Sequence, residues 1–187
     1  MIKQKIKDID LSFESSAACF SPQYVDKGTL AMLSYVQFSS GVKVLDLGCG
    51  YGVVGITAGK FTDPSLVYML DINKEALECA GKNAVLNGTP DVNIIKSNGY
   101  ENLDETGFDL ILSNPPYHSD FSVPKMFIEK GFNRLKVGGR FFMVTKRELW
   151  YKNKFTAIFG GVKIHEKDGY FIFEAEKRNS QYHRKRK

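Results

Sequence analysis

The fold is decided by one stretch of sequence, VKVLDLGCGYG, at residues 42–52. Its first half, Val42 to Leu47, is a short apolar run typical of a buried strand. The glycines that follow permit a sharp turn and a close approach of the backbone to a ligand. Residues 53–61 are predicted to be helical, so the turn leads into a helix N-terminus that presents free N–H groups.

The same alternation of strand and helix runs along the rest of the chain. Four more apolar runs are predicted strands: residues 66–70, 92–95, 108–112 and 140–145. Residues 162–166 and 170–176 flank Lys167-Asp168-Gly169, a hairpin signal. Helices are predicted at about Val25 to Val36, ahead of the first strand, and after Asn73, a candidate N-cap. Another is predicted from the helical spacing of apolar residues between Phe127 and Leu135, with Gly138-Gly139 as its end. These elements predict an α/β, Rossmann-like fold whose mostly parallel seven-stranded sheet closes in a C-terminal antiparallel hairpin.

The 187 residues are enough for one domain. We expect residues 1–177 to form it, with a helical N-terminal segment at 1–41 and a basic tail at 178–187. The net charge of +5 favours a polyanionic partner such as RNA. The tail carries four consecutive cations at 184–187 and is a candidate phosphate-binding segment, although a solvated terminus is the more common outcome of such a run.

Cysteine usage and hydropathy indicate the compartment. Cys19, Cys49 and Cys79 are odd in number and far apart, which argues against a disulfide framework or a zinc site. No run has the length of a signal-peptide core or a membrane span. We therefore expect a cytoplasmic protein with neither a membrane nor a metal partner.

Two carboxylates accompany the glycine turn. Asp46 ends the first strand, where a carboxylate suits an aminoacyl ammonium and not a pyrophosphate. Asp71 ends the next strand, where it can bind both hydroxyls of a ribose. Residues 50–55 also match G-x-G-x-x-G, which alone leaves a nicotinamide dinucleotide open. The position of Asp46 and the antiparallel closing hairpin favour a different nucleotide cofactor.

The most specific stretch is Asn114-Pro115-Pro116-Tyr117, which follows a predicted buried strand. An exocyclic amine is a poor nucleophile because its lone pair is delocalised, and two fixed acceptors near its hydrogens favour the attacking geometry. Asn114 offers its side-chain oxygen, and Pro115 offers a carbonyl without a competing N–H. The prolines keep these acceptors preorganised. Tyr117 presents a ring on which a base can stack, worth about 1–3 kcal/mol.

These motifs resemble those of class I S-adenosylmethionine (SAM)-dependent methyltransferases. Asn-Pro-Pro-Tyr resembles the motif of amino-methyltransferases that act on adenine N6, cytosine N4, guanine N2 or the glutamine amide. With His118, Phe20-Ser21-Pro22 and Asp26-Lys27-Gly28-Thr29, the chain is similar to the ribosomal RNA guanine-N2 methyltransferases of the small-subunit type. The resemblance covers roughly residues 13–177.

The resemblance implies SAM as the cofactor, with Gly48 and Gly50 beside its methionine part and Asp71 on its ribose. Asn98 stands where relatives usually place an Asp near the adenine amine, and its carbonyl oxygen can still accept that hydrogen bond. The residues assigned to the cofactor are Asp46, Gly48, Cys49, Gly50, Gly52, Asp71, Ile72, Asn98 and Asn114. The residues assigned to catalysis are Asn114, Pro115 and Tyr117.

The implied reaction is methylation of an exocyclic amine on an RNA base, with guanine N2 of ribosomal RNA as the first choice. Methylation of adenine N6 in RNA, methylation of a protein glutamine amide, and SAM binding without catalysis are the alternatives. Many enzymes of this type carry a degenerate second copy of the domain, for which the 45 residues ahead of Asp46 are too few. The interpretation requires the glycine turn and the diproline loop to face each other across one crevice.

Overall fold

From Val44 onward the chain alternates strands and helices in a computed structural model that describes residues 1–17, 21–115 and 121–182. The elements in chain order are β1 (Ile2–Ile6), β2 (Ile9–Phe13), α1 (Lys27–Tyr35), β3 (Val44–Leu47), α2 (Val53–Gly59), a 3-10 turn η1 (Pro64–Leu66), β4 (Val67–Asp71), α3 (Lys74–Leu86), β5 (Asn93–Lys96), β6 (Phe108–Ser113), α4 (Ser122–Arg134), β7 (Leu135–Thr145), α5 (Leu149–Phe159), β8 (Lys163–Lys167) and β9 (Tyr170–Glu176).

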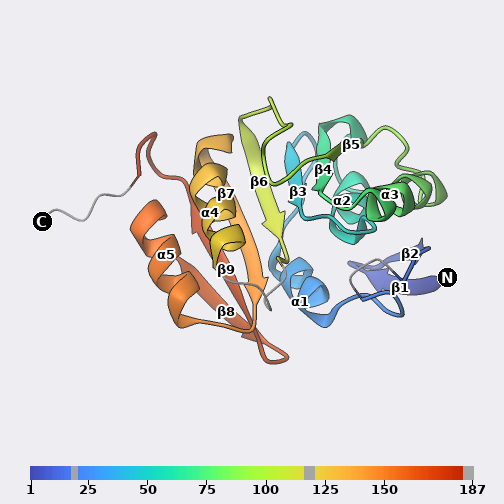
Figure 1. Ribbon diagram of the computed structural model, residues 1–187, viewed down its shortest axis with the longest axis horizontal. Coiled ribbons are helices and arrows are strands. Elements are labelled where there is room, and N and C mark those ends of the chain that lie inside the picture. The colour runs from blue at the N-terminus through green and yellow to red at the C-terminus, as the bar shows by residue number, and fades with distance from the viewer. Residues whose placement is uncertain (18–20, 116–120, 183–187) are drawn as a thin grey trace, which may run out of the picture.

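The central sheet has seven strands in the order β5-β4-β3-β6-β7-β9-β8 (Figure 1). Neighbours from β5 to β7 pair in parallel, whereas β9 is antiparallel to both β7 and β8. The predicted α/β fold with a closing antiparallel hairpin is therefore confirmed. The strand order reverses between β3 and β6, and such a switch point opens a crevice at the carboxyl ends of the strands.

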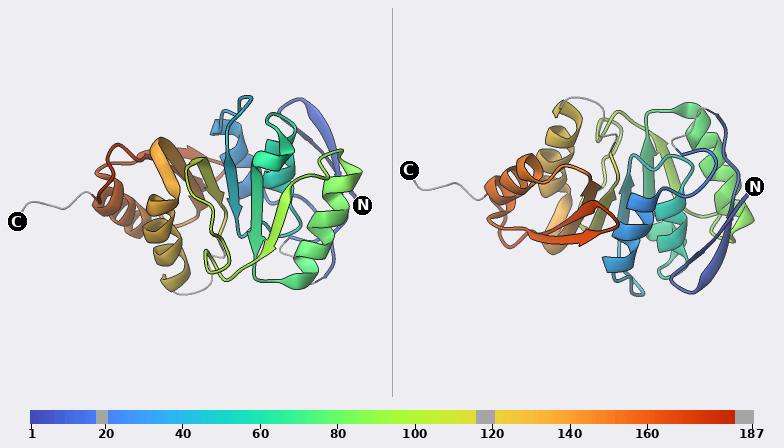
Figure 2. Two further views of the ribbon diagram at one scale, coloured as in Figure 1. Left: turned by 90° about the horizontal axis from the view of Figure 1, so that it is seen from above. Right: turned by 90° about the horizontal axis from the view of Figure 1, so that it is seen from below.

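Helices cover both faces of the sheet (Figure 2). Alternate strand residues point to opposite faces, and both sets are buried, so each face needs a layer of helices. Val44 packs in a core with α1, α2 and α3, whereas Leu45 and Leu47 pack in a second core with α4 and α5. Leu110 and Ile111 of β6 divide between the two cores in the same way. Burial on both faces explains why these strands are almost continuously apolar.

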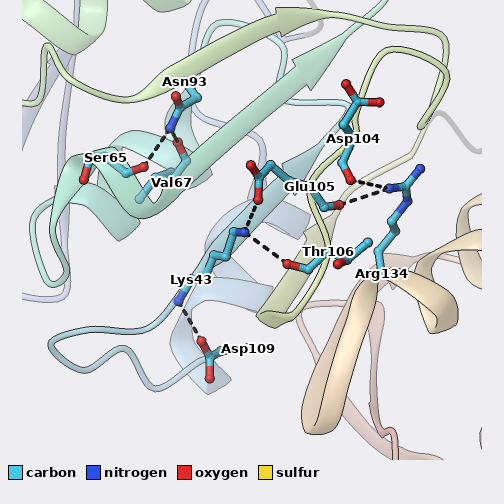
Figure 3. A network of polar contacts seen from close by, with 9 residues as sticks. All are labelled: Lys43, Ser65, Val67, Asn93, Asp104, Glu105, Thr106, Asp109 and Arg134. Carbon is cyan, nitrogen blue, oxygen red and sulfur yellow. Dashed lines mark hydrogen bonds and ion pairs between the residues drawn. The ribbon is translucent and has the colours of Figure 1, made fainter. Parts of the chain in front are cut away.

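At the amino ends of the central strands, a network of polar contacts surrounds Lys43 (Figure 3). The backbone N–H of Lys43 donates to Asp109 Oδ2 at 2.8 Å, and its ammonium group contacts Glu105 and the carbonyl of Thr106. Arg134 donates to the carbonyls of Asp104 and Glu105. These contacts anchor the 104–107 loop and the start of β6 at the amino ends of the strands, opposite the crevice.

The N-terminal segment differs from the expected helical segment, because a β-hairpin of β1 and β2 precedes α1. Its turn places Lys7 and Asp8 at φ 48° and 66°, without the glycine or asparagine that usually signals such a turn. The chain just beyond the hairpin is held by Asn83 of α3, whose Oδ1 accepts from Glu14 N at 2.7 Å. A polar side chain distant in sequence thus holds a segment whose own turn signal is weak.

The Gly138-Gly139 pair was predicted to end the helix before the fifth strand, which is wrong in detail. Helix α4 ends at Arg134, and both glycines lie inside β7. Gly138 has φ 85°, and the pairing of β6 with β7 shifts register between Phe108 and Leu110. A side chain at Gly139 would lie 2.7 Å from the carbonyl of Phe108, so this glycine permits close approach of two strands.

Candidate active site

The glycine turn after β3 depends on left-handed backbone conformations. Gly48, Gly50 and Gly52 have φ values of 76°, 55° and 98°. The N–H groups of Gly48 and Cys49 donate to the carbonyl of Leu70 at 2.8 and 2.9 Å, which ties the turn to the end of β4. A side chain at Gly52 would also lie 2.7 Å from Met69 Cε. The sequence pattern is thus required by both conformation and packing.

Asp46 is a buried carboxylate at the end of β3. Its side chain accepts from Gly55 N at 2.8 Å, at the start of α2. Burial raises the pKa of Asp46 to about 7; the Gly55 N–H lowers this pKa, and the neighbouring carboxylate of Asp71 raises it. A buried carboxylate with this pKa is well suited to a cationic ligand group, because such a group would supply the charge that water no longer screens.

Asp71 ends β4, and its carboxylate is oriented by the backbone. Oδ2 accepts from Gly50 N at 2.8 Å, and Oδ1 accepts from Asn73 N at 2.9 Å. Each oxygen retains a lone pair, so the carboxylate can still accept from a pair of hydroxyls. Ile72 is 63% exposed beside it and offers an apolar surface at the crevice. The backbone thus fixes the carboxylate of Asp71 at the cleft, while its predicted role in ribose binding stays a prediction.

Asn114 follows β6, and its amide is held in one orientation. Nδ2 donates to Asp26 Oδ1 at 2.8 Å and lies 2.9 Å from Thr29 Oγ1, both at the start of α1. The carboxylate can only accept, so the nitrogen branch must face it. Oδ1 of Asn114 is buried and has no hydrogen-bond partner among residues 1–17, 21–115 and 121–182. A buried unpaired acceptor is unusual in a protein and is available to a ligand donor.

Asp26 itself is held by the helix that it begins. As the N-cap of α1 it accepts from Thr29 N at 3.1 Å. A side chain at Gly28 would meet Tyr170 Cε1 at 2.7 Å, so the ring of Tyr170 packs directly on the first turn of α1. Besides its resemblance to the family motif, the Asp-Lys-Gly-Thr segment supports Asn114 through Asp26 and Thr29. Asp is a common N-cap residue, and only the fold brings this one to Asn114.

One cleft of about 400 Å³ brings the two predicted motifs together. The sequence-predicted residues that line it are Asp46, Gly48, Cys49, Gly50, Asp71, Ile72, Asn98 and Asn114. Gly52 packs behind the turn against Met69, and Pro115 is buried after β6. A buried bond from Ser113 Oγ to the carbonyl of Leu47, 2.7 Å long, joins the ends of β6 and β3. Tyr117 and His118 lie outside the described residues, as do Phe20 and the 184–187 cations.

The cleft also contains residues that the sequence did not single out. Val123 and Phe127 of α4 line its apolar side, and Thr29 lines it from α1. A side chain at Gly48 would project into the cleft, since its nearest neighbour is the Phe127 ring at 3.9 Å. The spacing of the α4 residues indicated a helix but not the surface that it presents to a ligand.

The chemistry of the cleft is that of binding and orientation. Burial raises the pKa of the Cys49 thiol, and the charges of Asp46 and Asp71 raise it further, so the thiol is not a ready nucleophile. No group of His, Cys, Asp and Glu that could hold a metal occurs in the described part of the chain. The carboxylates and the amide of the cleft suit a ligand with an ammonium group at Asp46, vicinal hydroxyls at Asp71 and a base near Asn98.

Comparison with known proteins identifies a family and several relatives of this chain. The family model of the Methyltransferase small domain matches residues 10–174. The uncharacterized protein YbxB of Bacillus subtilis is 30% identical over 179 residues, which are 92% of this chain and 89% of that protein. Ribosomal RNA small subunit methyltransferase C of Hahella chejuensis is 34% identical over 149 residues, 78% of this chain and 43% of that protein.

Among solved structures, the T. thermophilus 16S rRNA N2 G1207 methyltransferase (RsmC), in complex with AdoMet and guanosine, superposes with a TM-score of 0.85. It is 26% identical, and the match covers 94% of this chain and 50% of that one. The chain thus spans about half the length of the ribosomal RNA methyltransferases that it matches. No helix in residues 1–17, 21–115 and 121–182 is long and apolar enough to cross a membrane.

Proposed function

The chain belongs to the Methyltransferase small domain family, and from this premise we propose that it is a SAM-dependent methyltransferase that acts on an exocyclic amine of an RNA base. Guanine N2 of small-subunit ribosomal RNA is the substrate group that we expect. This choice is supported by the named relatives and by the neighbour whose structure contains AdoMet and guanosine.

The cofactor is held by the residues that line the β3–β4 side of the cleft. Asp46 binds the ammonium of the methionine part, Asp71 binds the ribose hydroxyls, and Asn98 lies toward the base. When bound, SAM supplies an electrophilic methyl group on a sulfonium and a neutral thioether as leaving group. The remaining task of the protein is to hold the amine in line with that methyl group.

The observation that carries the proposal is the orientation of the Asn114 amide. Its nitrogen branch is committed to Asp26 and Thr29, so its oxygen is the branch left to accept an N–H of the substrate. Acceptance of that hydrogen draws the amine out of conjugation with the base and exposes its lone pair. An amide is not a base at neutral pH, so Asn114 orients the amine and does not take its proton.

The test uses the whole chain with methyl-labelled SAM. Separate pools of RNA, ribosomal particles and proteins are incubated with the enzyme, digested, and analysed for the methylated product. We expect label in N2-methylguanosine and no label when Asn114→Ala replaces the wild type. Label in N6-methyladenosine or in glutamine would support methylation of an amine but would show that guanine N2 is not the substrate group. SAM binding without label in any pool would reject the proposal.

A further inference from the structure

Two exposed cations stand beside the candidate active site at the end of β7. Lys146 and Arg147 directly follow Thr145, the last residue of that strand. Strand β7 is the neighbour of β6, and Met143 pairs with Ser113, the residue before Asn114. Lys146 and Arg147 therefore lie at the same edge of the sheet as Asn114, a few residues beyond the paired position.

Aromatic rings hold both cations in place. The Lys146 ammonium lies 5.1 Å from the ring centroid of Tyr170, the residue that packs on the first turn of α1. The Arg147 guanidinium lies 5.3 Å from the ring centroid of Phe121, at the start of α4. One side chain thus lies toward α1 and the other toward α4.

Within the described ranges of the chain, Lys146 and Arg147 take part in no ion pair, although Glu148 is exposed next to them. A ring face limits the rotamers of a cation but leaves its N–H donors free. Two such cations at the mouth of a cleft create a local positive potential that attracts phosphate groups.

The loop before α1 extends this surface with an aromatic side chain and a third cation. The Tyr24 side chain is 61% exposed, and the Tyr24 carbonyl accepts from Ser21 Oγ at 2.6 Å. Lys27 is exposed in the first turn of α1, next to the Asp26 that holds Asn114. Cations for phosphates and an exposed ring for a base are the combination that binds single-stranded nucleic acid.

The basic tail, by contrast, begins at the opposite edge of the sheet. Strand β9 runs antiparallel to β7, so it leads away from the cleft, and Lys177 N donates to Gly139 O at 2.9 Å near the start of β7. Tyr182 then donates to the carbonyl of Glu129 at 2.8 Å on α4. The site and the start of the tail are thus separated by the length of the strands.

We propose that Tyr24, Lys27, Lys146 and Arg147 form the surface that binds a single-stranded segment of the substrate RNA. Lys146 and Arg147 contact the phosphates next to the target nucleotide, and Tyr24 stacks on a flanking base. The proposal rests on the proposed function, since it adds the RNA contacts of the same site. It assigns RNA binding to the carboxyl edge of the sheet instead of the tail.

The experiment compares two double variants of equal charge change. Lys146→Gln with Arg147→Gln removes the proposed contacts but keeps long side chains over the rings. Lys3→Gln with Lys82→Gln removes two exposed cations from β1 and α3, at the far end of the sheet, and serves as the control. Binding of a fluorescent single-stranded RNA is measured by anisotropy over a range of salt concentrations, and SAM binding is measured by calorimetry.

Each phosphate contact contributes about 0.7 to the slope of log affinity against log salt for single strands. The Lys146/Arg147 variant should therefore bind RNA more weakly, with a slope smaller by about 1.4, while it binds SAM as the wild type does. The control variant should keep the wild-type slope. Equal slopes in the two variants, or a wild type without affinity for RNA, would overturn the proposal.

Failure of this inference and failure of the proposed function can be told apart. A wild type that methylates RNA while the Lys146/Arg147 variant binds RNA as tightly as the control rejects the surface alone. A wild type that binds RNA through Lys146 and Arg147 but transfers no methyl group from SAM rejects the proposed reaction and leaves the surface in place.

Discussion

Replacement of Asp26 by alanine tests the claim that α1 holds Asn114 in its working orientation. Asp26 accepts from Asn114 Nδ2 at 2.8 Å and cannot donate, so it excludes the flipped amide. In Asp26→Ala only Thr29 remains, and its hydroxyl can donate to Oδ1 as readily as it accepts from Nδ2. The amide then loses its preferred orientation.

The size of the effect follows from the bond that is removed. A hydrogen bond to a charged group contributes about 1.5–3 kcal/mol. If this charge-assisted bond strengthens as Asn114 accepts the amine hydrogen, its free energy is lost from the transition state in Asp26→Ala. The value of kcat should then fall about ten- to a hundredfold, because each 1.4 kcal/mol corresponds to a factor of ten. Equal population of the two amide orientations would by itself lower kcat only about twofold. Asp26→Asn keeps an acceptor but loses the charge, so a smaller decrease is expected. The Kd of SAM should stay close to that of the wild type, since Asp26 lies on the amine side of the cleft.

Stability must be separated from orientation, because Asp26 also caps α1 and loss of an N-cap costs about 0.5–2 kcal/mol. Asp63 is a matched control: it caps η1 through a bond from Ser65 N at 2.9 Å, far from the cleft. We expect Asp63→Ala to leave kcat unchanged. A kcat within twofold of the wild type in Asp26→Ala, or a parallel loss of SAM affinity and kcat, would refute the reasoning.

Three further changes test the rest of the cleft. Asn114→Ala should abolish turnover and leave SAM affinity largely intact; equal loss of both in calorimetry and turnover assays would mean that its role is misassigned. Because burial raises the pKa of Asp46 to about 7, its carboxyl is mostly protonated below that pH, so SAM affinity should fall as pH falls through 7, and Asp46→Asn should abolish this dependence in titrations from pH 6 to 8. The raised folded-state pKa also means that stability is lost as pH rises from about 4 to 7, so Asp46→Asn should raise the free energy of unfolding at pH 8 by up to about 4 kcal/mol in urea titrations, and an unchanged midpoint would contradict it. Gly28→Ala places a methyl group 2.7 Å from Tyr170 and should lower the melting temperature and kcat together in thermal and turnover assays.

Much of the fold could be predicted because its signals are local. Apart from Asp46, the run Val44–Leu47 is apolar on both faces, as expected of a strand between two helix layers. The glycines after it occupy the left-handed conformations that only glycine adopts readily. Asn73 was predicted as an N-cap, and its Oδ1 does accept from Glu75 N at 3.0 Å at the start of α3. Each of these signals resides in a few consecutive residues.

The errors arose where a local signal was weak or ambiguous. The turn at Lys7 and Asp8 lacks glycine, so the sequence carries no strong signal for the β1–β2 hairpin. Gly138 and Gly139 are typical of a helix end, but here Gly138 adopts a positive φ inside β7 and Gly139 permits the close approach of β6. The same residue type serves both purposes, and only the packing of the neighbouring strand distinguishes them.

The sequence by itself determined the order of strands and helices from Val44 onward, the glycine turn, and the residue types of a cleft for a nucleotide-like cofactor and an amine. The tertiary structure decided that Asp26 and Thr29, 88 and 85 positions earlier in the chain, hold the amide of Asn114. It also decided that Lys146 and Arg147 border the cleft while the tail starts at the other end of the strands. The physical reason is the distance along the chain over which each interaction acts. Turns and periodicity depend on neighbouring residues, whereas the direction of an amide or the surroundings of a cation depend on which elements pack against each other.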